Sequence, residues 1–174
     1  VDVNCCGMSY LTNAYLGKDY QNRFFPEWGK VPAKWIKENV KTVYIQVRST
    51  SPHSSRRAYG ILAWYMDCEG VWGFAYNWGS HDWYIAWPFM DEEGNLGSTI
   101  GWEMLREGVD DYRYLKTLEN LLAKKTGRAK AREKIKSFLP SFNDLVCISG
   151  REFNQLRAII IEKIEKIEKG DVKW

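Results

Sequence analysis

Residues 42–78 read TVYIQVRSTSPHSSRRAYGILAWYMDCEGVWGFAYNW, and this stretch decides the predicted fold. Residues 42–48 alternate and are rich in β-branched side chains, which is typical of a strand. Residues 57–68 carry apolar side chains at helical spacing, and Gly70 follows as the expected stop of that helix. Residues 71–78 indicate a second strand. A strand, a helix and a strand in this order predict a βαβ unit with parallel strands.

The N-terminal flank extends this pattern by one more unit. Residues 1–6 (VDVNCC) indicate a short strand, the polar stretch 7–26 a long loop, and residues 32–40 a helix. Three β–α steps cannot complete a barrel or a doubly wound domain, and the first strand would leave an open edge. The sequence therefore predicts an α/β fold, the C-terminal portion (about three βα units) of a (β/α)8 TIM-like barrel whose earlier part lies outside this sequence.

The rest of the chain is predicted to be a hairpin followed by helices. Residues 83–97 form the predicted hairpin, with its turn at 91–95. The apolar positions of residues 99–125 advance by threes and fours, which predicts a long helix facing a core. A basic helix is expected at 128–138, and Ser149 with Glu152 forms a capping box that opens a last helix. The predicted division is a barrel segment at 1–126 and a helical C-terminal extension at 127–174.

Composition and charge argue against several classes of function. The 25 Lys and Arg against 22 Asp and Glu leave a net charge of +3, too small to indicate a nucleic-acid or membrane partner. No apolar run approaches the ~20 residues that span a bilayer. Four Cys without a C-x-x-C pair, and two His, do not make a zinc pattern. The sequence therefore predicts no metal, no cofactor, no nucleic acid and no membrane, and it leaves the compartment open.

Aromatic residues are the unusual feature of the composition. The chain has 9 Trp, 10 Tyr and 7 Phe, and six of the Trp fall between residues 64 and 102. They indicate either a large aromatic core or a surface that stacks on sugar rings. Ligands of (β/α) barrels bind at the C-terminal ends of the strands. The candidate substrate-binding residues lie at the ends of the second and third predicted strands or directly after the third. They are Arg48, Tyr76, Asn77, Trp78, His81, Asp82 and Trp83.

Catalytic residues are not identified in the sequence. Glycoside hydrolysis usually needs two carboxylates. Residues 91–93 (DEE) are acidic but precede Gly94 in a turn-like stretch. Asp67 and Glu69 lie at a helix end, on the wrong face of a barrel, and Asp82 has no visible second partner. Neither a nucleophile elbow nor a glycine-rich phosphate loop occurs.

The motif WEMLREGVDDYRYLKTLE, at residues 102–119, resembles a recurrent helix of glycoside hydrolase family 123. The stretch at 56–78 is similar to the helix and strand that precede it in that family, and residues 83–100 are similar to its hairpin. The resemblance implies a retaining hydrolase of N-acetylgalactosaminides, assisted by the acetamido group of the substrate. Its Asp-Glu pair lies on an earlier strand and has no counterpart here, and Gly101 stands where relatives often have Arg.

These observations predict the C-terminal, sugar-binding part of a glycoside hydrolase that acts on N-acetylhexosamine glycans, with its catalytic Asp-Glu pair upstream. Two alternatives remain open, a non-catalytic carbohydrate-binding protein and a structural module whose aromatic residues all belong to a core. The open strand edge predicts that the chain associates either with the missing N-terminal segment or with itself.

Overall fold

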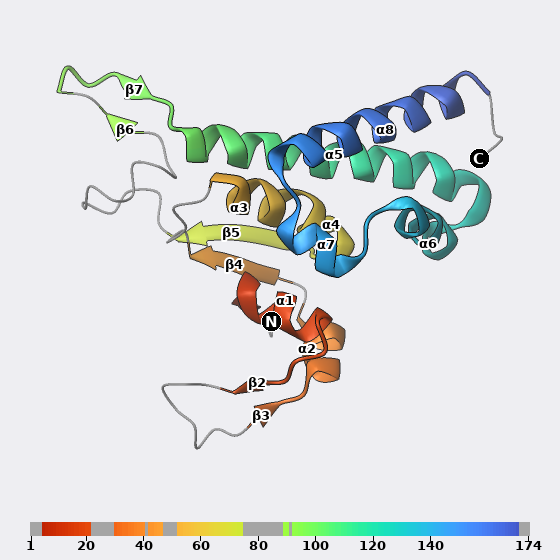
Figure 1. Cartoon of the computed structure of the whole chain (residues 1–174), viewed down its shortest axis with the longest axis horizontal. Helices are drawn as coiled ribbons and strands as arrows, with labels where there is room; N and C mark the ends of the chain where they lie inside the picture. The colour runs from red at the N-terminus through yellow and green to blue at the C-terminus, as the bar shows by residue number, and fades with distance from the viewer. Residues whose placement is uncertain are drawn as a thin grey trace.

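A three-stranded parallel sheet lies near the middle of the computed structural model, which describes residues 5–21, 30–40, 42–46, 52–74, 89–90 and 92–170. Its strands follow the order β1-β4-β5, with bounds β1 (Cys5–Gly7), β4 (Thr42–Gln46) and β5 (Gly70–Phe74). Each falls at a segment predicted to be a strand. The pairing is in register to the carboxyl end, where Gln46 lies opposite Phe74. Figure 1 shows β4 and β5 pointing to the same end of the molecule.

Two helices and a small hairpin connect β1 to β4. They are α1 (Met8–Tyr15), β2 (Tyr20–Gln21), β3 (Lys30–Val31) and α2 (Ala33–Asn39). The prediction of a loop from residue 7 to residue 26 is therefore wrong at α1. Packing stabilises this helix, although its sequence is rich in polar residues. Ala14 is fully buried, and the Tyr15 hydroxyl donates to the carbonyl of Met66 at 3.2 Å. Tertiary contacts override weak intrinsic propensity here.

The crossover from β4 to β5 is a helix with an irregular middle. It comprises α3 (Pro52–Arg57), a π-helical turn η2 (Ala58–Leu62) and α4 (Ala63–Tyr65). The helix was predicted to begin at residue 57, but it begins at Pro52, whose fixed φ suits a first turn. Gly60 departs from helical geometry, with φ −103° and ψ −109°. The turn still buries Ile61, and Trp64 after it is 1% exposed.

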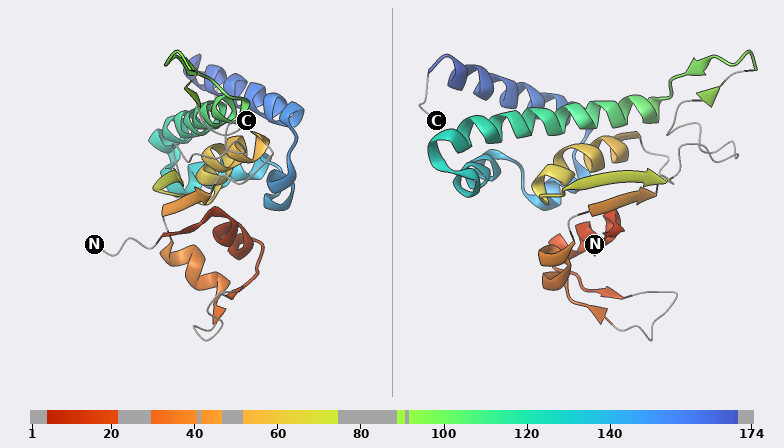
Figure 2. Two further views of the ribbon diagram at one scale, coloured as in Figure 1. Left: turned by 90° about the vertical axis from the view of Figure 1, so that its left-hand side faces the viewer. Right: turned by 180° about the vertical axis from the view of Figure 1, so that it is seen from behind.

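The C-terminal half of the described chain is a layer of helices. The hairpin of β6 (Phe89–Met90) and β7 (Leu96–Gly97) leads into four helices, which are α5 (Ile100–Thr126), α6 (Arg128–Phe138), α7 (Phe142–Cys147) and α8 (Gly150–Glu168). The capping box at Ser149 is confirmed, with both of its hydrogen bonds present. In Figures 1 and 2, the crossover helices lie between the sheet and α5, and α8 runs beside α5.

The predicted portion of a (β/α)8 barrel is wrong. Helices dominate the described residues, the sheet is limited to three short strands, and no barrel forms among them. The long helix α5 packs against α3, η2, α6 and α8. Its buried residues Leu115, Leu118 and Leu122 therefore enter a core built mainly between helices. The prediction that this helix faces a core is confirmed, but an apolar stripe does not specify what a helix is buried against. The division between residues 126 and 127 stays a prediction.

Candidate functional site

The seven predicted sugar-binding residues lie outside the described residues; they are Arg48, Tyr76, Asn77, Trp78, His81, Asp82 and Trp83. The described chain stops just before them, at Gln46 on β4 and at Phe74 on β5. These two residues are paired in the parallel sheet. The segment that carries Arg48 and the segment that carries Tyr76 therefore leave the sheet from adjacent positions at one edge. Figure 1 places the β6–β7 hairpin and the start of α5 at this end of the molecule.

The acidic residues considered for catalysis have other roles where they are described. Glu92 and Glu93 are exposed beside Gly94, whose φ of 85° requires a turn. Asp67 follows α4, accepts a hydrogen bond from Arg128 Nη2 at 2.5 Å and forms an ion pair with Arg132 at 3.2 Å. Asp91 lies outside the described part of the chain. Glu92 and Glu93 therefore lie in an exposed turn, and Asp67 pairs with arginines of α6.

The motif at residues 102–119 holds helices together. Arg56 of α3 donates from Nε to Asp111 of α5 at 2.7 Å, and Arg157 of α8 donates to the same carboxylate at 2.6 Å. The side chains of Arg56 and Asp111 are only 4% and 7% exposed. Arg56 also donates to Asn154 at 2.9 Å and lies over the ring of Phe153, 4.7 Å from its centre. One buried carboxylate thus joins three helices.

A second buried carboxylate, Glu119, joins α5 to α4 and α6. Its oxygens accept from Trp64 Nε1 at 2.9 Å, from Arg128 Nε at 3.0 Å and from Arg132 Nη1 at 2.7 Å. Lys116 is a fourth donor, at 2.6 Å. Burial by itself would raise the pKa of Glu119, but these hydrogen bonds and the charge of Arg132 outweigh it and lower that pKa. Glu119 is therefore ionised and fully engaged in the core.

Sequence reasoning missed these two networks although a signal was present. Asp111 and Glu119 lie on the same helical stripe as Leu115, Leu118 and Leu122, at spacings of three and four. Carboxylates on a core-facing stripe are almost never buried without partners, so they indicate buried ion pairs. In this chain, two acidic positions of the 102–119 motif, Asp111 and Glu119, are therefore explained by the contacts between helices that they make.

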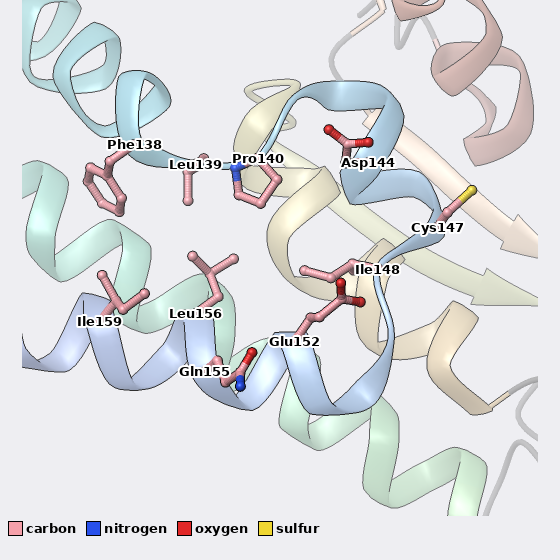
Figure 3. Close-up of a pocket in the computed structure, with 10 residues that line it drawn as sticks. All are labelled: Phe138, Leu139, Pro140, Asp144, Cys147, Ile148, Glu152, Gln155, Leu156 and Ile159. Atoms are coloured by element: carbon pink, nitrogen blue, oxygen red, sulfur yellow. The ribbon is translucent and has the colours of Figure 1, made fainter.

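A groove opens between the end of α6, α7 and the first half of α8 (Figure 3). It is a cavity of about 540 Å³, and we call it the α7–α8 groove. Sequence reasoning did not predict it, because α7 has only 6 residues and shows no periodicity long enough to recognise. The residues that line it are Phe138, Leu139, Pro140, Asp144, Cys147, Ile148, Glu152, Gln155, Leu156 and Ile159.

Within the described ranges of the chain, no group of three or more His, Cys, Asp or Glu side chains could hold a metal ion. No helix in the same ranges combines the length and the apolar character needed to cross a membrane.

Comparison with known proteins returns no relative. No family model matches the chain, and no curated protein or solved structure is significantly similar to it. The resemblance to glycoside hydrolase family 123 has no support from these comparisons and stays a prediction.

Proposed function

We propose that this chain binds a carbohydrate at the carboxyl edge of its parallel sheet, as the sugar-binding part of a hydrolase of N-acetylhexosamine glycans. The observation that carries the proposal is the register of β4 and β5, which pairs Gln46 with Phe74. Two segments far apart in sequence thus start side by side at the edge where open α/β sheets bind ligands. The catalytic Asp-Glu pair would come from polypeptide outside these 174 residues.

The composition of the two segments supports a sugar as the ligand. Residues 75–88 (AYNWGSHDWYIAWP) contain three Trp and two Tyr, whose rings offer flat apolar faces. Asn77 and Asp82 of that segment, and Arg48 of the other, supply the hydrogen-bonding groups that hydroxyl and acetamido groups need. Trp64, by contrast, is buried and bonded to Glu119, so the core interpretation is correct for that residue.

Calorimetric titration with N-acetylgalactosamine, N-acetylglucosamine and glucose tests this proposal. We expect the acetylated sugars to bind, and Trp78→Ala to weaken binding at least about ten-fold, or ~1.4 kcal/mol. Trp35→Ala is the matched control, because Trp35 is 46% exposed on α2, a helix outside the two segments. Equal binding by wild type and Trp78→Ala would remove the stacking role, and no binding by the wild type contradicts the proposal.

Hydrolysis is tested separately with an aryl N-acetylgalactosaminide and the full-length protein. We expect turnover if the Asp-Glu pair is supplied from outside these residues. Retained sugar binding without turnover would instead favour the non-catalytic carbohydrate-binding alternative.

A further inference from the structure

The two segments of the proposed sugar site are tethered at both ends to elements that the structure describes. Residues 47–51, which include Arg48, connect β4 to α3, and residues 75–88 connect β5 to the hairpin that leads into α5. The near ends of both segments are fixed by the pairing of Gln46 with Phe74. The positions of their far ends therefore depend on where α3 and the start of α5 are held.

The tether that carries Arg48 is short. Arg48 follows Gln46 by two residues and precedes Pro52, the first residue of α3, by four. The six Cα–Cα steps from Gln46 to Pro52 span at most roughly 22 Å, even when fully extended. The place of α3 therefore limits where Arg48 can lie.

The crossover helices α3 and α4 run parallel to α5. Arg56 bonds to Asp111 and Trp64 bonds to Glu119, and the residues of both pairs are 55 positions apart. A separation that stays constant along both helices means that they point in the same direction. Figures 1 and 2 show α3 and α5 starting at the end of the molecule where β4 and β5 end. A contact near these two starts thus acts on both segments.

Arg56 and Asp111 make the buried ion pair that is closer to these starts. All three nitrogens of the Arg56 guanidinium donate, Nε and Nη2 to Asp111 at 2.7 and 3.3 Å, and Nη1 to Asn154 of α8 at 2.9 Å. Such a bidentate pair fixes the orientation of both side chains. The backbones also touch here, because a Cβ atom on Gly108 would lie 2.6 Å from the carbonyl oxygen of Arg56. The distance between α3 and α5 is therefore set at this point.

We propose that Arg56 and Asp111 are positioning residues of the sugar site, which set the distance between the far ends of its two segments. This inference rests on the proposed function. Glu119 provides the contrast, because its side chain is 1% exposed and that of Asp111 is 7% exposed, and both join α5 to the crossover helices. Glu119 lies eight residues further along α5, roughly 12 Å farther from the start of the helix. Its loss should leave the two segments in place.

Calorimetric titration with N-acetylgalactosamine compares Asp111→Asn with Glu119→Gln, two substitutions that each remove one buried charge from α5. We expect Asp111→Asn to weaken sugar binding at least about ten-fold, since small displacements of binding groups are costly, and Glu119→Gln to leave it unchanged. Urea denaturation of both variants shows that they are folded and how much stability each has lost. Equal weakening of binding by the two variants would overturn the inference, because general destabilisation would explain it.

Gly108→Ala changes the same spacing without removing a charge. The added Cβ atom meets the backbone of Arg56, so α3 and α5 must move apart where Asp111 joins them. This variant should also weaken sugar binding, and it takes the place of Asp111→Asn if that protein does not fold. Sugar binding by Gly108→Ala equal to that of the wild type would contradict the role of this spacing.

Fluorine NMR of protein labelled with fluorotryptophan tests the positioning without a sugar. The 75–88 segment contains three labels, assigned by replacing each with Phe, at Trp78, Trp83 and Trp87. We expect Asp111→Asn to shift the signals of this segment, and Glu119→Gln to shift chiefly that of Trp64, its hydrogen-bond partner. A wild type that binds no sugar would contradict the proposed function, and the fluorine signals would still decide on the positioning. Segment signals that Asp111→Asn leaves unchanged would overturn the inference.

Discussion

Glu119 shows how one residue can determine the stability of this chain. Its side chain is 1% exposed, and its two oxygens accept four hydrogen bonds from three helices. Burying a carboxylate is costly unless charge and hydrogen bonds compensate it, and here both do. The guanidinium of Arg132 also lies 4.5 Å from the ring centre of Trp64, so the cation is packed as well as paired.

We expect Glu119→Gln to lower the free energy of unfolding by about 3 kcal/mol, measured by urea denaturation. This is the lower end of the range for breaking a buried ion pair, because Lys116 and Arg128 stay 35% and 59% exposed. Asp110→Asn on the same helix is the control, since its pair with Arg113 lies at the surface. A Glu119→Gln variant as stable as Asp110→Asn would show that this network contributes little.

Gly108 sets the distance between two elements, α5 and α3. A Cβ atom at this position would lie 2.6 Å from the carbonyl oxygen of Arg56 and 3.0 Å from its Cα. The carbonyl oxygen of Gly108 in turn lies 2.8 Å from a Cβ built on Gly60. Only glycines at these two positions allow the helices to approach so closely. The same approach brings Arg56 within 2.7 Å of Asp111.

Gly108→Ala should lower the free energy of unfolding by about 1–3 kcal/mol, because backbone atoms of α3 must move away. The gain in helix propensity, about 1 kcal/mol, offsets only part of this cost. Gly150→Ala is the matched control, since its Cβ would meet the side chain of the exposed His53, which can rotate. Thermal unfolding of both variants checks the prediction, and equal melting temperatures would contradict the close contact of α5 with α3.

For the whole molecule, the pKa shifts predict stability that declines at both ends of the pH scale. The pKa of Glu119 is lowered from 4.5, so its contribution is complete above about pH 4.5 and is lost as the pH falls through its folded value. Burial raises the pKa of Tyr59, and of Tyr15, from 10.0 to about 12. Their contributions are complete below pH 10 and are lost as the pH rises toward 12.

The urea midpoint of Tyr59→Phe should therefore fall less than that of the wild type as the pH rises above 10. We expect the difference in urea midpoint between the two proteins to be constant below pH 10 and to shift in favour of the variant between pH 10 and 12, the two pKa values of Tyr59. Tyr114→Phe is the control, because Tyr114 is at the surface. Parallel profiles for wild type and Tyr59→Phe would contradict the effect of burial on Tyr59.

Local signals in the sequence predict where most elements begin and end. The side chain of Thr99 accepts from Trp102 N at 3.1 Å and caps α5, as Ser149 and Glu152 cap α8. Gly127, with a φ of 81°, separates α5 from α6. These signals join residues at most three positions apart, so they can be recognised in a short stretch of sequence without knowledge of the tertiary structure. α1 and α7 were missed because they are short, with 8 and 6 residues, and show no long apolar stripe. Ser141 does cap α7, since its side chain accepts from Asp144 N at 3.3 Å, but this signal was not recognised.

By itself, therefore, the sequence determined the periodicity and the boundaries of the longer helices, and the positions of the three strands of the parallel sheet, but not the β2–β3 hairpin. Only the tertiary structure decided that α5 packs on the crossover helices and α8, that Gly108 contacts Arg56, and that a groove opens beside α7. The reason is physical: periodicity shows which face of a helix is buried, whereas its partner depends on contacts such as Arg56 with Asp111, 55 residues apart.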